Sequence, residues 1–291
     1  MAIANEHITH YREHGFAVVE NFLAPALLAA AREEIEALLP GWLDYADNPQ
    51  APKPDHWNEP GRSRRTLRFP FLGRALNDIT LHPDLQDFAK LMTGGEDIVC
   101  EQSDLTYKCR GHYADSEQVM HLDYMNHTLV YPPDLPKYWQ TAFLLYYSDV
   151  SIDQAPTAVT SWQAYRDELL WPAAHTRDER PALYDKEVKV TVPAGSLLAY
   201  SMRTFHRGTA FQADGARVGH FISYAPKNPR WMGIVGWPEQ GVHAGFASWM
   251  VQASPAERAL VGFPAPGDPY WTEETRAGVA ARFPGIDLSV Y

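Results

Sequence analysis

The stretch Met120–Tyr124 constrains this chain most, because it places an imidazole and a carboxylate two residues apart. On a β-strand alternate side chains share a face, so His121 and Asp123 would point to one side and Leu122 to the other. Two histidines and one carboxylate form a facial set of metal ligands that leaves the opposite positions of an iron ion open. The pair therefore supplies two ligands of such a set, and the third has to come from a distant strand.

His206 is the candidate for the third ligand, because it follows a hydrophobic strand and precedes a turn. Eleven residues later Arg217 opens another strand, and the intervening Gln212–Gly215 predicts a hairpin. Such a hairpin would bring Arg217 back beside His206. A guanidinium near a metal is suited to binding a carboxylate through two parallel hydrogen bonds.

Two other histidines could compete for the metal. His220 lies three residues after Arg217 on the same predicted strand, so the two side chains face opposite sides. His127 lies beyond the expected end of the His121 strand, and we expect it beside the site or facing the substrate. A His-x-Asp pair alone often occurs by chance. The prediction rests on its conjunction with a late histidine and an arginine eleven residues further on.

Short strands separated by Gly, Pro and Asp turns dominate residues 96–228, which predicts a sandwich or barrel. The expected strands are Ile98–Gln102, Leu105–Lys108, Met120–Tyr124, Thr141–Asp149, Glu187–Val192, Ser196–Ser201 and Val218–Ala225. Residues 1–95 are predicted to be mainly helical, with helices at 8–15, 25–39 and 76–92 and one strand at 16–20. The aromatic-rich residues 229–291 show no linker before them. We expect them to pack on the core, so that residues 1–291 form one domain.

The charge balance limits the classes of molecule that this protein is expected to bind. Thirty-six acidic and 25 basic residues give a net charge of −11, which argues against nucleic acid or an anionic membrane surface as the main partner. No apolar run approaches a membrane span. The two cysteines, Cys100 and Cys109, are expected to be free thiols, and the N-terminus has no pattern of a signal peptide. These features predict a cytoplasmic protein, and they leave its oligomeric state open.

Residues 41–75 are predicted to be irregular and carry a basic cluster in an acidic chain. The cluster consists of Arg62, Arg64, Arg65 and Arg68. It is either a solvated loop or a lid that binds a carboxylate or phosphate of the substrate, with Arg64 and Arg68 as candidates. Tyr124 and other aromatic residues would suit a ring-bearing substrate, although aromatic residues at this level are also typical of a core.

These features together resemble the phytanoyl-CoA dioxygenase family of iron(II)- and 2-oxoglutarate-dependent oxygenases. The resemblance runs from about Ile8 to about Pro226. Tyr11–Leu23 looks like the family's opening helix and strand, and Pro193–Tyr200 resembles the strand that leads to the distal histidine. The Pro-Gly-Ser-His sequence that usually follows the turn at Ala155–Ser161 is absent here.

The resemblance implies a mainly β fold with flanking helices, in which a double-stranded β-helix, or cupin-like jelly roll, forms the core. It implies that iron(II) is held by His121, Asp123 and His206, that 2-oxoglutarate chelates the iron, and that Arg217 pairs with the distal carboxylate. O2 would be the third reactant. The implied reaction is oxidation, most simply hydroxylation, of a small molecule, as in natural-product biosynthesis, with release of succinate and CO2.

The resemblance also implies roles for neighbouring residues. Gln118 and Thr141 are similar in position to polar residues that contact the cosubstrate. Gly208 replaces a hydroxyl residue often found two positions after the distal histidine. Related halogenases have a small residue in place of Asp123, so the carboxylate favours hydroxylation, desaturation or ring chemistry over halogenation.

Two alternatives remain open from the sequence. A cupin-like metalloenzyme could use the same three ligands without 2-oxoglutarate, but it would leave Arg217 unexplained. A non-catalytic binding protein could share the scaffold. Its mark would be the loss of a ligand, and none is lost here.

Overall fold

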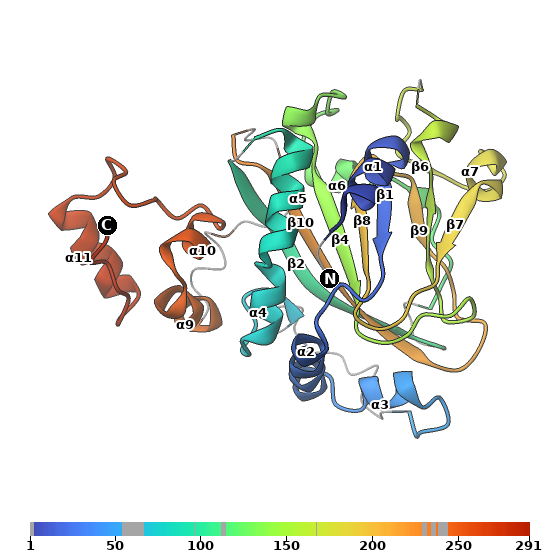
Figure 1. Cartoon of the computed structure of the whole chain (residues 1–291), viewed down its shortest axis with the longest axis horizontal. Helices are drawn as coiled ribbons and strands as arrows, with labels where there is room; N and C mark the ends of the chain where they lie inside the picture. Colours follow the sequence, from blue (N-terminus) through green and yellow to red (C-terminus); the bar gives the residue numbers. More distant parts are fainter. Residues whose placement is uncertain are drawn as a thin grey trace.

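Two five-stranded antiparallel sheets form the core of the computed structural model and stack as a jelly roll (Figure 1), which confirms the predicted fold. Their strand orders are β1-β8-β4-β10-β2 and β6-β3-β9-β5-β7. The structure describes residues 3–53, 67–95, 97–111, 115–166, 168–228, 232–233, 237 and 244–291.

The central strands of the first sheet, β8 and β4, are buried on both faces. The strands of this sheet are β1 (Phe16–Val19), β8 (Leu197–Ser201), β4 (Thr141–Tyr146), β10 (Ala216–Pro226) and β2 (Ile98–Cys109). On β4, Phe143 and Leu145 join the cluster beneath the helices, whereas Leu144 and Tyr146 join the cluster between the sheets. Both faces therefore select apolar residues, which is why these strands read as continuous hydrophobic runs.

The second sheet is built from shorter strands. These are β6 (Ala174–His175), β3 (Met120–His121), β9 (His206–Gly208), β5 (Thr157–Thr160) and β7 (Glu187–Val190). His121 of β3 lies directly opposite His206 of β9 in the antiparallel register. Pairing of these two strands therefore brings together two histidines that are far apart in the sequence.

Helices from the first third of the chain cover the outer face of the first sheet (Figure 1). The N-terminal helices are α1 (Asn5–His14), α2 (Pro25–Leu38), α3 (Trp42–Asp47), α4 (Ala75–Thr80) and α5 (Pro83–Thr93). The sequence did not predict α3. The helix predicted over 76–92 is two helices, because Pro83 starts a new helix after an extended His82. The remaining short helices of this part are α6 (Tyr124–His127), η2 (Pro136–Tyr138), η3 (Trp162–Ala164) and α7 (Pro181–Asp185).

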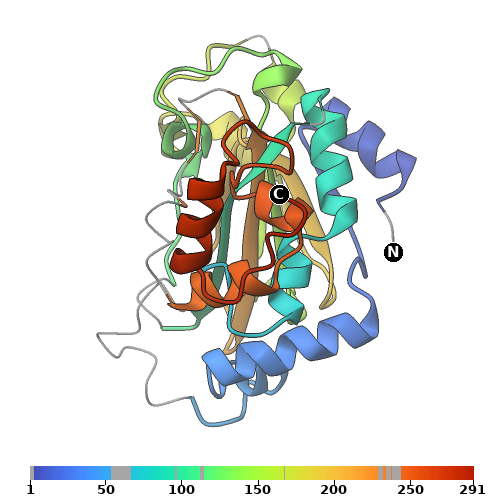
Figure 2. The same ribbon diagram turned by 90° about the vertical axis from the view of Figure 1, so that its left-hand side faces the viewer.

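A C-terminal extension packs against the free edge of β2 (Figure 2). Its helices are α9 (Ala244–Gln252), α10 (Pro255–Ala259) and α11 (Glu273–Arg282). The backbone N–H of Cys100 donates to Leu260 O at 2.9 Å, and Trp237 Nε1 donates to Cys100 O at 2.7 Å. Phe69 meets Trp249 edge-on, with ring centroids 4.9 Å apart. The extension therefore satisfies backbone groups of an edge strand that would otherwise be open.

Both cysteines are buried, and neither forms a disulfide with a described residue. Among the described residues no helix combines the length and apolar character needed to cross a bilayer.

Candidate metal centre and its cavity

Three side chains converge between the two sheets. His121 ends β3, Asp123 precedes α6, and His206 begins β9. His206 Nε2 lies 3.3 Å from Asp123 Oδ2, and His121 Nε2 lies 3.6 Å from Asp123 Oδ1. One ligand atom from each residue falls within 4.8 Å of the others, so the three could coordinate one ion. The sequence singled out the same three residues.

The local geometry of the first two residues differs from the prediction. We expected His121 and Asp123 to alternate along one strand, but β3 ends at His121, and Asp123 has helical dihedral angles of φ −75° and ψ −19°. The Asp123 carboxylate is instead oriented by Tyr200 of β8, whose hydroxyl donates to Oδ2 at 2.9 Å. Tyr200 of the first sheet thus positions Asp123, which follows β3 of the second sheet in the chain.

Both histidines are held in the same tautomer. His121 Nδ1 lies 2.8 Å from Val119 O, and His206 Nδ1 lies 3.0 Å from Thr204 O. A carbonyl oxygen only accepts, so each Nδ1 carries the proton and donates. In the neutral rings Nε2 then presents its lone pair toward Asp123, as a metal ligand must.

The charges of the three groups depend on one another. Burial alone would raise the pKa of Asp123, but the charge of His206 and its hydrogen bond hold that pKa well below its usual value. Burial would lower the pKa of His206, and Asp123 raises it above the usual value. Burial and the neighbouring His206 lower the pKa of His121. Asp123 is therefore anionic, which suits a ligand for a divalent cation.

Arg217 lines the same cavity but arrives there by a different route from the predicted one. We expected a hairpin between His206 and Arg217, yet β9 and β10 belong to different sheets, so that prediction was wrong. Arg217 is 8% exposed, its Nε has no hydrogen-bond partner among the described residues, and its guanidinium carbon lies 5.9 Å from the centroid of the Tyr146 ring. A buried guanidinium without an anionic partner is an unsatisfied group that a carboxylate ligand would satisfy.

Lys108 is a cavity residue that the sequence analysis missed. It lies on β2 directly opposite Arg217 of β10. Its Nζ donates to Ser116 O at 3.2 Å and to Thr209 O. Burial first, and then the charge of Arg217, lower the pKa of Lys108 to about 8. Only the pairing of the two strands reveals this second cation, because the sequence does not give their register.

The two predicted cosubstrate contacts have different outcomes. Gln118 lines the cavity, and its Oε1 accepts from the Gly208 N–H at 2.7 Å. A Cβ at position 208 would lie 2.8 Å from that oxygen, so glycine makes room for the Gln118 amide. Thr141 is fully buried on the other face of β4, 3.2 Å from the hydroxyl of Tyr11. The expected contact of Thr141 with the cosubstrate is therefore wrong.

His127 and His220 lie where the sequence placed them. His127 lines the cavity beside the triad. Its Nδ1 donates to Asp123 O at 2.9 Å, and its Nε2 lies 3.1 Å from Gln102 Oε1. His220 faces away from the triad and is fully buried, with Nε2 2.8 Å from Ser103 Oγ.

The remaining substrate candidates do not reach the cavity in the described part of the chain. The Tyr124 hydroxyl donates to Leu170 O, and its ring is buried between the sheets. Arg68 pairs with Asp104 of β2, with Nε 2.6 Å from Oδ1. The expectation that these two bind substrate is corrected, because other protein groups already engage both polar ends. Arg64 lies outside the described residues.

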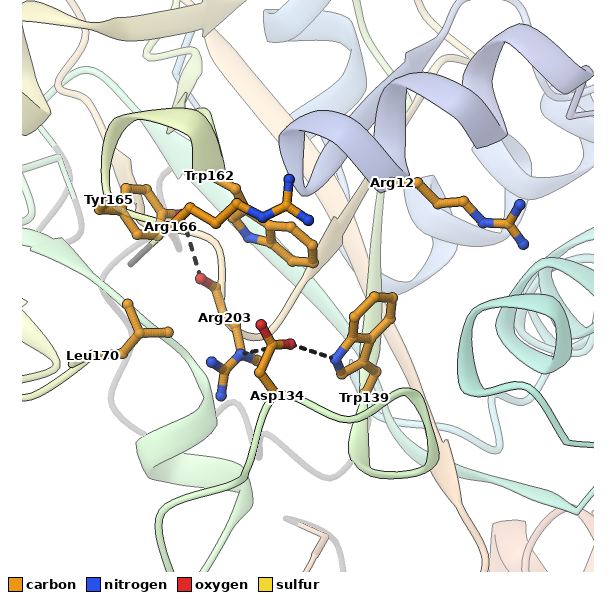
Figure 3. Close-up of a pocket in the computed structure, with 8 residues that line it drawn as sticks. All are labelled: Arg12, Asp134, Trp139, Trp162, Tyr165, Arg166, Leu170 and Arg203. Atoms are coloured by element: carbon orange, nitrogen blue, oxygen red, sulfur yellow. Dashed lines mark hydrogen bonds and ion pairs between the residues drawn. The ribbon is translucent and has the colours of Figure 1, made fainter. Parts of the chain in front are cut away.

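A second, smaller cavity lies beside α1 and η3 (Figure 3). Its deepest cation is Arg203, whose Nη1 donates to Pro132 O at 2.6 Å and whose Nε lies 3.8 Å from Asp134 Oδ1. Trp139 Nε1 donates to the same carboxylate oxygen at 2.9 Å, as Figure 3 shows. Here the arginine is tied to the 132–139 loop, and its role is structural.

A jelly roll that carries two histidines and a carboxylate at one end of its interior, with a buried arginine nearby, defines the class of iron- and 2-oxoglutarate-dependent enzymes. The sequence pattern of the phytanoyl-CoA dioxygenase (PhyH) family matches residues 11–219, and the chain belongs to that family. Members of the family use Fe(II), 2-oxoglutarate and O2. No curated protein sequence matches the chain.

Three solved structures of similar fold have less than 20% sequence identity to this chain. SnoK, a non-haem α-ketoglutarate-dependent carbocyclase of nogalamycin biosynthesis, is 17% identical with a TM-score of 0.56, over 84% of this chain and 92% of SnoK. AviO1 from Streptomyces viridochromogenes is 18% identical with a TM-score of 0.54, over 80% and 99%. HygX from Streptomyces hygroscopicus, solved with nickel and 2-oxoglutarate, is 18% identical with a TM-score of 0.53, over 78% and 88%.

Proposed function

We propose that this protein is an iron(II)- and 2-oxoglutarate-dependent dioxygenase that hydroxylates a small molecule. In this proposal His121, Asp123 and His206 hold the iron, and Arg217 binds the distal carboxylate of 2-oxoglutarate. The observation that carries it is the buried, unpartnered Nε of Arg217 in the same cavity as the three converging ligands. A metalloenzyme without 2-oxoglutarate would leave that group buried without a partner.

The donor set fits the proposed groups. Two neutral imidazoles and one carboxylate suit iron(II), and the protonated Nδ1 atoms leave both Nε2 atoms free to coordinate. For the 2-oxoglutarate carboxylate, Arg217 offers a planar fork of N–H donors and Lys108 adds a second positive charge from the facing strand. The Nε2 donor of the Gln118 amide has no partner among the described residues and faces the same cavity.

Bound iron(II) would supply the redox chemistry that couples cleavage of O2 to oxidation of 2-oxoglutarate. The overall reaction converts substrate C–H, 2-oxoglutarate and O2 into substrate C–OH, succinate and CO2. The protein's own part is positional. Backbone carbonyls at Val119 and Thr204 fix the two imidazole rings, and Tyr200 fixes the carboxylate. The carboxylate at position 123 supports hydroxylation over halogenation.

The neighbouring structures support a substrate from natural-product metabolism. SnoK is described as acting in nogalamycin biosynthesis, and HygX has been solved with hygromycin B bound. The cavity that contains the triad has a volume of about 880 Å³, which lies in the range of small-molecule sites and leaves room for a substrate beside 2-oxoglutarate.

An anaerobic titration tests the proposal. Addition of Fe(II) and then 2-oxoglutarate to the purified protein should produce the weak visible absorption of the iron–keto acid chelate. A cupin-like metalloenzyme would bind the metal without this band, and a binding protein would show neither. Absence of the band at saturating 2-oxoglutarate, in protein that holds one iron per chain, would contradict the proposed function.

A further inference from the structure

The cavity has two chemically different ends along β2. Lys108 lies opposite Arg217 at one end, and Gln102 lies opposite Ser223 at the other. Six residues separate Lys108 from Gln102, which is roughly 20 Å along a strand. If 2-oxoglutarate occupies the cationic end, as proposed above, the substrate has to approach the metal from the Gln102 end.

Polar, uncharged groups dominate the Gln102 end. The Gln102 amide lies between His127 Nε2 at 3.1 Å and Asp104 Oδ2 at 2.8 Å, so its orientation is fixed. Asn126 is exposed next to His127, and its side-chain amide has no partner among the described residues. Asp104 itself is neutralised by Arg68. This end therefore offers hydrogen-bond donors and acceptors with no unpaired ionic group among the described side chains, and both ring nitrogens of His127 have hydrogen-bond partners.

Aliphatic side chains are missing from the described wall of the cavity. Fifteen described residues line it, and none is Ala, Val, Leu, Ile, Met or Pro. Among the described lining residues, the only tyrosine, phenylalanine or tryptophan side chains are Tyr107 and Phe221. Small-molecule sites are usually lined mainly by apolar side chains, because burial of apolar surface drives binding. A wall without aliphatic groups offers an acyl chain little, since each buried methylene needs an apolar contact.

From this lining we infer that the substrate is a neutral, hydroxyl-rich molecule of the sugar or cyclitol type, and not an acyl thioester. The inference rests on the proposed function. The Asn126 amide offers a donor and an acceptor side by side, and the Gln102 amide, whose two ends bond Asp104 and His127, keeps a second N–H and a second lone pair. Each substrate hydroxyl is likewise both donor and acceptor. Gln102 and Asn126 are the residues assigned to substrate hydroxyls. A substrate that lacks one of these hydroxyls loses a hydrogen bond to the amide and binds more weakly.

The test uses the anaerobic enzyme loaded with Fe(II) and 2-oxoglutarate, and calorimetry measures binding of two probe sets. The hydroxyl-rich set is methyl α-D-glucopyranoside, trehalose and myo-inositol, and the acyl set is octanoyl-CoA and palmitoyl-CoA. We expect at least one hydroxyl-rich probe to bind at least tenfold more tightly than either acyl-CoA. Tighter binding of an acyl-CoA, or binding of no hydroxyl-rich probe, would overturn the inference.

Variants locate the binding site. Asn126→Leu, at an exposed position that should not disturb folding, should weaken binding of the best hydroxyl-rich probe about tenfold, and Gln102→Leu should do the same. In both variants the affinity for 2-oxoglutarate should stay within twofold of wild type. Gln252→Leu, on the exposed surface of α9, is the matched control and should change neither. Unchanged probe binding in both cavity variants would also overturn the inference. Loss of 2-oxoglutarate binding in the wild-type enzyme would instead contradict the proposed function.

Discussion

The partly buried Arg203 and the buried Arg217 end in cavities of the same protein with opposite surroundings. Arg203 donates to a backbone carbonyl and lies beside Asp134, so protein groups surround it on its polar side (Figure 3). Arg217 has no hydrogen bond or ion pair with a described residue, its buried Nε has no partner among those residues, and the residue opposite it on β2 is another cation, Lys108. Low exposure alone does not distinguish a structural arginine from one that binds a ligand. The two kinds of arginine differ in the groups that their guanidinium contacts.

The largest expected effect separates the two aspartates of these cavities. Asp123→Ala should lower 2-oxoglutarate-dependent succinate formation by at least about a hundredfold, because it removes a proposed metal ligand. Loss of a residue that only orients a ligand typically has a smaller effect. Iron content after dialysis should fall in parallel. Asp134→Ala, its counterpart beside Arg203, should keep succinate formation within twofold. Full turnover in the Asp123 variant would refute the metal assignment.

The arginines themselves give the next largest effect. Arg217→Ala should raise the KM for 2-oxoglutarate by roughly a hundredfold, since truncation of one member of a buried charge pair costs about 3 kcal/mol. Its iron content should change little. Arg203→Ala should leave this KM within twofold but lower the free energy of unfolding by about 1–2 kcal/mol through lost hydrogen bonds. An exchange of these two phenotypes would reverse the roles given to the arginines.

Lys108 adds a pH dependence to the cationic end. Burial, Arg217 and, to a smaller extent, Arg207 together lower its pKa to about 8, against an opposing effect of Asp115. The ammonium is charged below that pH and loses its charge above it, whereas Arg217 stays charged. The KM for 2-oxoglutarate should therefore rise several-fold, up to about tenfold, between pH 7 and pH 9. Lys108→Met should have a flat profile over this window, and a parallel rise in the variant would assign the titration elsewhere.

Glu101 offers a second comparison with Arg217, because its buried Oε2 also has no hydrogen-bond partner among the described residues. Burial raises its pKa to about 8, while a hydrogen bond from Gln140 opposes the shift. A raised carboxyl pKa means that the folded state binds more protons than the unfolded state between pH 4.5 and 8, so its contribution to stability falls as pH rises through that window. Unlike an arginine, this group can become neutral and needs no ligand.

Glu101→Gln should accordingly be more stable than wild type at pH 8.5, by roughly 1–3 kcal/mol, and close to wild type at pH 4.5. Urea denaturation at the two pH values measures the difference. Glu33→Gln, at an exposed position of α2, should stay within about 0.5 kcal/mol of wild type at both. An equal gain at both pH values would show that the effect is not one of protonation.

Sequence was sufficient for the jelly roll and for the convergence of the triad. His121 and Asp123 are near neighbours, and family resemblance pointed to His206. The reason for their proximity was not predictable in detail, because β3 ends at His121 and Tyr200 of the other sheet orients Asp123. The hairpin prediction failed because the 209–215 connection crosses between sheets, which a turn-forming sequence does not encode.

The failure at Thr141 has a different cause. Both faces of β4 are buried, so the alternation that normally tells inside from outside is absent from this strand. The sequence of β4 therefore does not show which face Thr141 occupies, and the structure turns Thr141 toward Tyr11. Lys108 was missed for the converse reason, since its relation to Arg217 exists only through the register of β2 with β10.

The contacts at Cys100 have a practical consequence for anyone who shortens this protein. A fragment trimmed to the family-matched residues 11–219 would lose Leu260 and Trp237, and also the last residues of β10 that pair with β2. The backbone of β2 would then lose its partners at Cys100 on the outer side and its β10 partners from Ile98 to Leu105 on the inner side. Such exposed strand edges recruit strands from other molecules, so the fragment should form inclusion bodies even though it keeps the three proposed metal ligands.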